Sequence, residues 1–488
     1  MSGGGARLTR FGPAAAALLA LAGCASLPET QPETTSPPIA APRTTGVQTA
    51  ELREHERLVA LFGGEYRAPR AEALLNGVLA RLAPASDTPG EPYKVTILNS
   101  PVVNAFALPT GNIYVTRGLL ALANDTSEVA AVMAHEIAHV SARHAAARAE
   151  LERRSQLVGR VVSEVLAKPQ ERNVVEARSK LTLASFSRQQ ELEADRIGVR
   201  NIARANYDPY GATRFLNSLG RSASLRSAAL GAGPSGDRPD ILATHPSTPD
   251  RVAAALAAAR QIGAPGLGEA GRAPYLAVVD GVAYGDDPTE GIVRGRNFVH
   301  PKLAFAFEAP EGFTLENGPK ALLGVAGGGA EALRLDSVRV SASTPLETYL
   351  GSGWIEGLQT ATVETATING LPAATAIARG QEWTFRLAAI RFGTDVYRLI
   401  FATRALTPDA DGRFRAAIQS FRRISQDEAA AVKPLRLALT RAEPGAGAEA
   451  LARRMQGVDR PLDLFLLLNG LERGAALAPG ETYKIVVE

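Results

Sequence analysis

The segment His135-Glu136-Ile137-Ala138-His139 places two histidines and a glutamate at a spacing that suits metal chemistry. Residues four apart share one face of a helix, so His135 and His139 can direct two imidazoles at one Zn²⁺ ion. Glu136 lies about 100° further around the helix and can take a proton from water whose pKa the metal lowers to about 7. The segment predicts a hydrolytic zinc site with Glu136 as general base; the alternative is a pair of surface histidines.

A catalytic zinc needs a third protein ligand and one open position. His144 lies five residues after His139, a spacing that should turn it away from the metal. Glu191 and Asp195 lie four apart, so both carboxylates share one face of a predicted helix, while Glu193 should face away. One of the two can bind the metal, and the other can accept a hydrogen bond from the distal nitrogen of a ligating histidine. The alternative is a solvated acidic helix face.

The paired segments resemble zinc endopeptidases of the HtpX, BepA and Ste24-protease type, which form metallopeptidase family forty-eight within the gluzincins. The resemblance covers roughly residues 51–262 and includes the run Ile113-Tyr114-Val115-Thr116-Arg117-Gly118-Leu119-Leu120. It implies a metalloendopeptidase with one Zn²⁺ per chain, polypeptide substrates, and Glu136 as general base. The implied zinc ligands are His135, His139 and Glu191, with Asp195 supporting them from outside.

The same resemblance concerns three further parts of the sequence. It implies that a strand borders the cleft, where a substrate peptide adds as an extended strand through main-chain hydrogen bonds. It also suggests that His245, within Thr244-His245-Pro246, can occupy the fourth zinc position and hold the enzyme latent; a capped loop is the alternative. Arg251 can stabilise oxyanion charge in the transition state or pair with a carboxylate. The residues of the cleft strand are Asn104, Ala105, Phe106 and Ala107.

The beginning of the chain has the features of an export signal. Arg7 and Arg10 precede a short apolar stretch that ends in Leu21-Ala22-Gly23-Cys24, which resembles a bacterial lipobox. The resemblance implies cleavage after residue 23 and acylation of Cys24, which would anchor the protein facing the periplasm. Ala25 follows the cysteine, so the outer membrane is favoured. The alternative is a plain cleaved signal without a lipid. Cys24 is the one cysteine of the chain, so an internal disulfide is excluded. The net charge of +3 gives no electrostatic footprint for nucleic acid.

Composition and periodicity predict a multidomain protein. After the signal at 1–23 comes a Pro-rich tether at 24–50 and then the metallopeptidase domain at 51–265, mainly α-helical with a small β-sheet. Residues 272–425 alternate apolar and polar positions as half-buried strands do, so we expect an α+β domain, for which the sequence suggests no chemistry. Isolated His55 and His300 are expected to be ordinary surface or loop residues.

The tail, residues 433–488, has the order strand, helix, helix, strand and resembles a LysM domain. The family often binds cell-wall glycan, but Gly445-Ala446-Gly447 stands where it usually has Gly-Asp-Thr, which weakens a peptidoglycan assignment. The leading hypothesis is a zinc endopeptidase that cuts misfolded or stalled envelope proteins. The alternative classes are a chaperone-like or scaffold lipoprotein and, on the tail alone, a glycan-binding module.

Overall fold

The computed structural model describes residues 45–150, 186–230, 241, 245 and 249–488. Residues Glu51–Glu488 form one compact unit. The predicted signal peptide, Cys24 and most of the predicted tether lie outside the described residues. None of the described helices combines the length and apolarity needed to cross a membrane.

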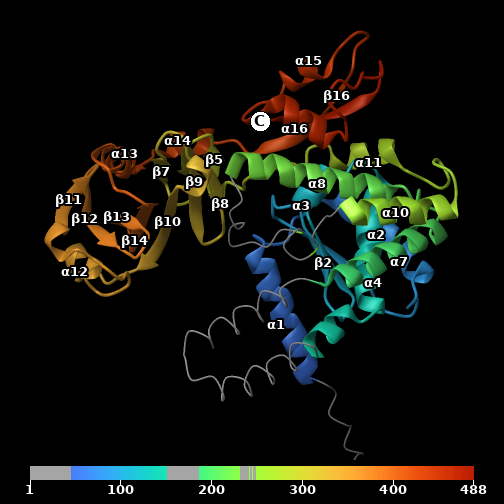
Figure 1. The fold of residues 1–488 in the computed structure, drawn as a ribbon, viewed down its shortest axis with the longest axis horizontal. Coiled ribbons are helices and arrows are strands. Elements are labelled where there is room, and N and C mark those ends of the chain that lie inside the picture. The colour runs from blue at the N-terminus through green and yellow to red at the C-terminus, as the bar shows by residue number, and fades with distance from the viewer. Residues whose placement is uncertain (1–44, 151–185, 231–240, 242–244, 246–248) are drawn as a thin grey trace, which may run out of the picture. The chain divides into compact units, whose positions relative to one another are not determined.

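Helices dominate the region that carries the zinc motif (Figure 1). Helix α4, Thr126–Ser141, is buried from Thr126 through His139 and packs against α2, α7, α8, α11 and β2. Burial on all sides explains its run of small and apolar residues. The described helices here are α1 (Thr45–Leu61), α2 (Pro69–Ala85), α3 (Arg117–Leu122), α4, α7 (Arg188–Arg204), α8 (Gly211–Leu230), α10 (Pro249–Ile262) and α11 (Arg272–Val279).

Three short strands form the predicted small sheet beside α4. They are β1 (Lys94–Leu98), β2 (Ala105–Ala107) and β3 (Asn112–Thr116), in the order β1-β3-β2, with β1 parallel and β2 antiparallel to β3. Gly111 turns the chain into β3 with φ +86°, a value that favours glycine. Strand β2 therefore forms an edge of the sheet next to the zinc-motif helix, as the sequence predicts for residues 104–107.

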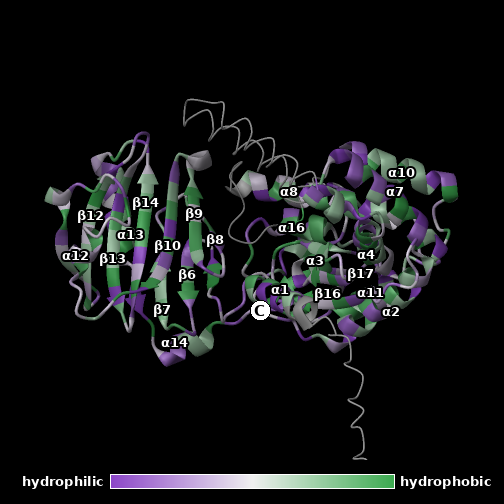
Figure 2. Cartoon of the chain, turned by 90° about the horizontal axis from the view of Figure 1, so that it is seen from below, coloured by the Kyte–Doolittle hydropathy of each residue, from purple (hydrophilic) through white to green (hydrophobic). Residues whose placement is uncertain are grey.

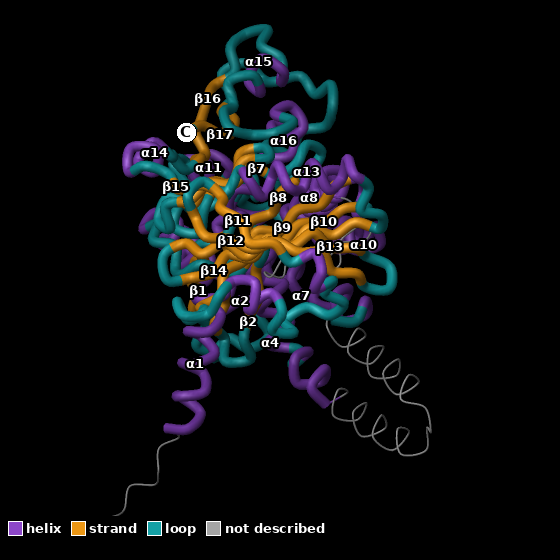
Figure 3. The backbone as a smooth tube through the Cα atoms, turned by 90° about the vertical axis from the view of Figure 1, so that its left-hand side faces the viewer, coloured by secondary structure: helices purple, strands orange, loops and turns teal. Residues whose placement is uncertain are grey.

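Residues 292–423 form a sheet-rich module with its own core (Figures 2 and 3). A seven-stranded antiparallel sheet has the order β11-β12-β13-β14-β10-β9-β8, and a four-stranded sheet has the order β15-β7-β6-β5. Rings from both sheets meet in this core: Phe305 lies 4.8 Å from Tyr397 and 5.0 Å from Phe421 between ring centroids. This confirms the predicted α+β character.

The strands and helices of this module follow one another along residues 292–431. The four-stranded sheet contains β5 (Ile292–Arg294), β6 (Asn297–His300), β7 (Phe305–Glu308) and β15 (Arg422–Arg423). The larger sheet contains β8 (Thr314–Asn317), β9 (Ala321–Ala326), β10 (Glu331–Arg339), β11 (Glu364–Ile368), β12 (Leu371–Arg379), β13 (Thr384–Phe392) and β14 (Asp395–Thr403). The helices are α12 (Leu346–Leu350), α13 (Pro408–Gln419) and α14 (Gln426–Ala431), with 3₁₀ turns at Gly327–Gly329 and Thr360–Thr362.

The tail has the predicted order of elements: β16 (Leu435–Arg441), α15 (Ala448–Ala452), α16 (Pro461–Leu468) and β17 (Thr482–Val487). Its two strands pair antiparallel, and the short strand β4 (Ala283–Tyr284) adds to the other side of β16. The tail does not have a core to itself, because Leu437, Phe465 and Ile485 belong to the same buried cluster as the helices around α4. Helix α11 belongs to that cluster too, so packing joins residues 272–284 to the peptidase region.

Lys484 connects the tail to the start of the zinc-motif helix. Its side chain is fully buried, and Nζ donates to the carbonyl oxygens of Ala121, Leu122 and Ala123 at 2.8, 3.4 and 2.6 Å. These carbonyls end α3, whose last turn has no further helical donors. Lys484 thus caps the short helix that leads directly into α4.

At the start of α4 the sequence places Glu128 three residues after Asp125, the spacing of a reciprocal capping box, and the structure differs from that prediction in one detail. Asp125 caps the helix as expected, because its carboxylate accepts from the backbone N–H of Glu128 at 2.9 Å. The Glu128 carboxylate, however, accepts from the N–H of Asn124 instead of the N–H of Asp125. The reciprocal capping box is therefore wrong by one residue, since Asn124 also presents a buried N–H that needs a partner.

Candidate metal centre

Helix α4 brings the two motif histidines together. The Nε2 atoms of His135 and His139 lie 3.0 Å apart, and both side chains are buried. Their rings meet edge to face, with centroids 4.6 Å apart. The two nitrogens therefore face a common point, as the helical spacing predicts.

Helix α7 supplies a carboxylate to the same point. Ser187 and Gln190 form a capping box that starts this helix, and Glu191 stands in its first turn. The Glu191 oxygens lie 3.5 Å from Nε2 of His135 and 3.5 Å from Nε2 of His139. Gly198 allows α7 to approach α4, because a Cβ there would lie 3.2 Å from the backbone nitrogen of His135. The close packing of two helices thus sets the ligand geometry.

His245 completes the cluster from a distant part of the chain. Its Nδ1 lies 2.9 Å from Oε1 of Glu191 and 3.3 Å from Nε2 of His135. Each of the four residues offers one ligand atom, and these atoms all lie within 4.8 Å of one another. Three imidazoles and one carboxylate form a donor set typical of zinc, and its ligand atoms are close enough to share one ion.

Asp195 and Arg251 support the cluster from behind. Asp195 Oδ1 lies 2.9 Å from Nδ1 of His135, the nitrogen that faces away from the cluster. Arg251 donates twice to Asp195 at 2.7 Å and also lies 2.7 Å from Oε2 of Glu191. Asp195 thus takes the place predicted for the supporting carboxylate. Arg251 lies against the two carboxylates, which corresponds to the pairing alternative for this residue.

Residues 69–259 match the family described as "Peptidase family M48". This region is an M48 peptidase domain. The match contains the four clustered residues, and it confirms the resemblance drawn from the motifs.

Several characterised proteins are similar to the M48 domain. The beta-barrel assembly-enhancing protease of Escherichia coli is 32% identical over 203 residues, which cover 40% of each chain. Mitochondrial metalloendopeptidase OMA1 of Arabidopsis thaliana is 38% identical over 166 residues, covering 34% of this chain and 31% of that protein. The mitochondrial OMA1 of Bos taurus is 31% identical over 167 residues, covering 32% and 31%. The chain therefore spans well under half the length of these relatives.

The solved structures offer a weaker likeness. The solution structure of cyanobacterial PsbP from Synechocystis covers 28% of this chain with 14% identity and a TM-score of 0.23. This similarity is too low to bear on the fold.

The electrostatics of the M48 site separate the two helix histidines. Burial favours neutral His135, but hydrogen bonds to Asp195 and Glu191 outweigh it and raise the pKa of His135 to about 10. Burial and the neighbouring His135 lower the pKa of His139. Burial would raise the pKa of Glu191, yet its hydrogen bonds to His135 and His245 hold that pKa well below its usual range. An anionic Glu191 among imidazoles is the charge state that a cation requires.

Glu136 lies beside the cluster without belonging to it. Burial raises the pKa of its carboxyl group above the usual range, which suits a group that must take up a proton. Its Oε1 atom is buried and lacks a hydrogen-bond partner among the described residues, and it lies 3.8 Å from Nε2 of His245. The backbone of Ala107 in β2 provides a hydrogen bond to the same carboxyl group. Glu136 thus connects the metal cluster to the edge strand.

The structure adds two residues that the sequence analysis did not place here. The ring of Phe186 lies against that of His139, with centroids 4.0 Å apart. His144 is buried and contacts His139, although it is not one of the clustered ligand residues, as its spacing leads us to expect. Five residues after His139 is a poor spacing on a continuous helix, but α4 ends at Ser141 and the chain turns back. No glycine or proline in residues 140–145 marks that turn in the sequence.

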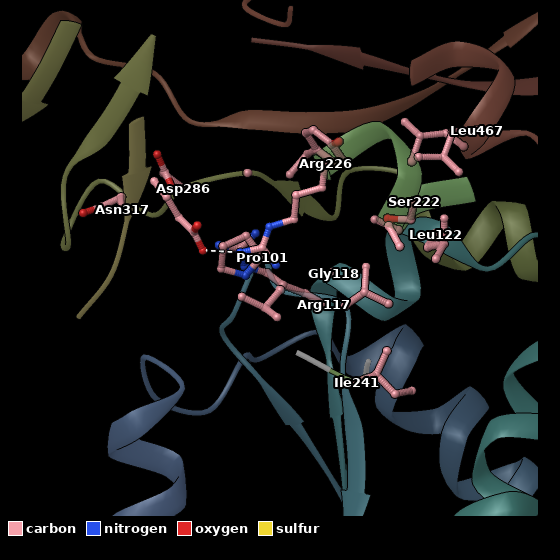
Figure 4. Close-up of a pocket in the computed structure, with 18 of the residues that line it drawn as sticks. Pro101, Arg117, Gly118, Leu122, Ser222, Arg226, Ile241, Asp286, Asn317 and Leu467 are labelled. Carbon is pink, nitrogen blue, oxygen red and sulfur yellow. Dashed lines mark hydrogen bonds and ion pairs between the residues drawn. The ribbon is translucent and has the colours of Figure 1, made fainter. Parts of the chain in front are cut away.

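A separate cavity of about 400 Å³ lies beside α3 (Figure 4). An ion pair between Arg226 and Glu316, 2.6 Å long, closes part of its wall, and Asp286 lies nearby with a pKa that burial raises to about 6. None of the predicted site residues lines it. Its lining includes Pro101, Arg117, Gly118, Ser222, Ile241 and Leu467.

Proposed function

We propose that this chain is a zinc metalloendopeptidase that hydrolyses peptide bonds in misfolded or stalled proteins of the cell envelope. The observation that carries the proposal is the convergence of His135, His139, Glu191 and His245 within 4.8 Å, with the unpartnered Oε1 of Glu136 beside them. The M48 match and the metalloendopeptidase relatives support the same reaction class.

In this proposal His135, His139 and Glu191 hold the zinc ion throughout. Zinc acts as a Lewis acid that polarises the scissile carbonyl and makes water more acidic. Glu136 takes a proton from the attacking water and returns it to the leaving amine, a task for which its raised pKa is suited. Asp195 Oδ1 lies 2.9 Å from Nδ1 of His135, where a carboxylate can hold the proton on Nδ1 and direct the lone pair of Nε2 toward the metal. Arg251 orients Asp195 and Glu191.

His245 holds the enzyme latent in this proposal. Its Nδ1 lies among the ligand atoms of the other three residues, so it occupies the position that water needs. Release of His245 opens that position and allows substrate and water to enter. The described arrangement, with His245 among the ligand atoms, is therefore the latent, closed form of the enzyme in this proposal.

The substrate adds as an extended strand to the edge of β2 that does not pair with β3. Residues 104, 106 and 108 face β3, as shown by the backbone bonds from Thr116 to Asn104 and from Leu108 to Asn112. The alternate residues, Ala105 and Ala107, turn their backbone groups to the other side. A peptide bound there lies next to Glu136, because β2 packs against α4.

The sequence supports a place in the bacterial envelope. Acylation of Cys24 anchors the protein, with the outer membrane favoured, and the following Pro-rich residues tether the M48 domain on the periplasmic side. The tail carries the element order of a LysM domain, and through it the proposal includes a contact with cell-wall glycan.

The proposal is tested by metal removal and restoration. Full-length protein in detergent, with His245→Ala to exclude latency, is treated with 1,10-phenanthroline, dialysed, and assayed for casein cleavage. We expect cleavage to disappear and to return with one equivalent of zinc. Cleavage that survives removal of zinc would refute a metalloendopeptidase. A zinc-loaded protein that never cleaves would favour the chaperone-like or scaffold alternative.

A further inference from the structure

The chain turns sharply just after the zinc-motif helix. Helix α4 ends at Ser141, and Arg143 adopts φ +54°, a left-handed conformation that is uncommon for a residue with a side chain. The backbone N–H of Arg143 donates to the carbonyl of Val140, which closes the turn. As a result His144, which a continuous helix would direct outward, is only 4% exposed and points back at the site.

The turn places His144 against a proposed zinc ligand. Nδ1 of His144 lies 3.0 Å from Nδ1 of His139, and the rings meet edge to face with centroids 4.9 Å apart. Nε2 of His139 faces the cluster, so Nδ1 is its distal nitrogen. His144 thus lies beside the distal nitrogen of His139, in the same way that Asp195 lies beside the distal nitrogen of His135.

Proton positions follow from this geometry once a metal takes the lone pair of His139 Nε2. The proton of His139 must then reside on Nδ1, which donates to Nδ1 of His144. The Nδ1 of His144 accepts, so its own proton resides on Nε2. That atom lies 3.5 Å from Oε2 of Glu193, a half-exposed carboxylate on α7. The hydrogen bonds run in one direction, from His139 to His144 and on toward Glu193.

We infer that His144 is a positioning residue that fixes the tautomer and ring orientation of His139 for metal binding, with Glu193 holding His144 in the matching tautomer. The inference rests on the proposed function, because it takes His139 to be a zinc ligand. Outer partners of ligating histidines usually contribute 10-fold to 100-fold in metal affinity. In this site the outer partner of His135 is Asp195, which Arg251 holds in place, whereas the outer partner of His139 is His144.

The test is zinc affinity, measured on the full chain in detergent by competition with a chromophoric chelator. We expect His144→Ala to raise the zinc Kd about 10-fold to 100-fold. His144→Asn should stay within about threefold of the parent, since its Oδ1 can accept the same hydrogen bond in place of Nδ1. His300→Ala, another buried histidine far along the chain, is the matched control and should leave the Kd unchanged. Glu193→Ala should give a smaller rise than His144→Ala.

A second readout separates positioning from loss of structure. With Co²⁺ in place of zinc, the visible absorption bands report ligand geometry, and we expect them to shift in His144→Ala and to return in His144→Asn. Equal Kd values and equal spectra for the parent and His144→Ala would overturn the inference, as would failure of His144→Asn to restore either in a folded protein. Tight, His144-dependent zinc binding without any cleavage would contradict the proposed enzyme and leave the positioning role intact.

Discussion

Nδ1 of His245 lies 2.9 Å from Oε1 of Glu191, although the two residues are separated by 54 positions in the chain. A histidine at this place shares its carboxylate neighbour with the metal that Glu191 is proposed to bind. The contact therefore joins Glu191, which stays on the metal in the proposed mechanism, to His245, which must leave the metal before substrate can bind.

Replacement of His245 by alanine should raise basal proteolysis. The variant loses the fourth ligand but keeps His135, His139 and Glu191, so water gains access to an otherwise complete site. We expect casein cleavage to increase about tenfold or more, the effect of removing roughly 1.4 kcal/mol of stabilisation from the closed form. Unchanged or lower activity in a folded, zinc-containing variant would contradict latency. The double variant with Glu136→Gln should stay inactive.

Strand addition at β2 can be tested on the substrate instead of the enzyme. A cleavable peptide is made with single N-methyl groups at successive positions around the scissile bond. Methyl groups on amides that face β2 should lower kcat/KM about fivefold or more, because each removes a main-chain hydrogen bond worth about 1 kcal/mol. Methyl groups on the intervening amides should have little effect. A uniform response at all positions would argue against an extended strand.

Much of this site could be predicted because its determinants are local. The His135 and His139 pair, the Asp125 cap and the Glu191 and Asp195 pair all follow from helical spacing, and the structure reproduces that spacing. The strands of residues 292–423 follow from alternation of apolar and polar side chains. Patterns of this kind need no knowledge of the rest of the fold.

Other features depend on contacts that spacing does not encode. His144 reaches His139 because Arg143 adopts a left-handed backbone conformation. Glycine would have indicated such a conformation in the sequence, but arginine does not. The apolar positions of the tail predict that Leu437 and Phe465 are buried, but not that they are buried against the M48 domain. The predicted boundary at 265 lies in Ala264-Pro265-Gly266 and the one at 433 precedes Pro434, whereas the shared core contains residues from both sides of residue 265 and from the tail.

Lys484 should matter for stability. Lys484→Met keeps much of the volume but leaves the carbonyls of Ala121 and Ala123 without their donor, at a cost of about 2–4 kcal/mol in the free energy of unfolding. Chemical denaturation followed by tryptophan fluorescence and circular dichroism gives this value. The exposed Lys433→Met is the control and should change it by less than about 0.5 kcal/mol. Equal losses in both variants would mean that the cap contributes nothing specific.

The sheet-rich module should lose stability in mild acid through His300. Its side chain is only 9% exposed, so the surface position expected from the sequence is wrong. Burial, aided by Lys302, lowers the pKa of His300 from 6.5 to about 4. Between these values the unfolded chain binds a proton that the folded one does not, so stability falls as pH drops through this window.

His300→Asn removes this titration and keeps an acceptor for the backbone N–H of Leu303. The parent should lose about 1–2 kcal/mol more than the variant between pH 7 and pH 4.5, allowing for partial contact with water. Urea denaturation at both pH values measures the difference. Parallel losses in the two proteins would assign the acid sensitivity to other groups.

The central claim is tested most directly by zinc content and casein cleavage, measured together on His245→Ala protein with and without Glu136→Gln. Glu136 is not among the four clustered ligands, so its replacement should leave the metal in place while removing the general base. The account predicts about one zinc per chain in both proteins and cleavage only where Glu136 is intact. Absence of zinc, or equal cleavage by both proteins, would contradict it.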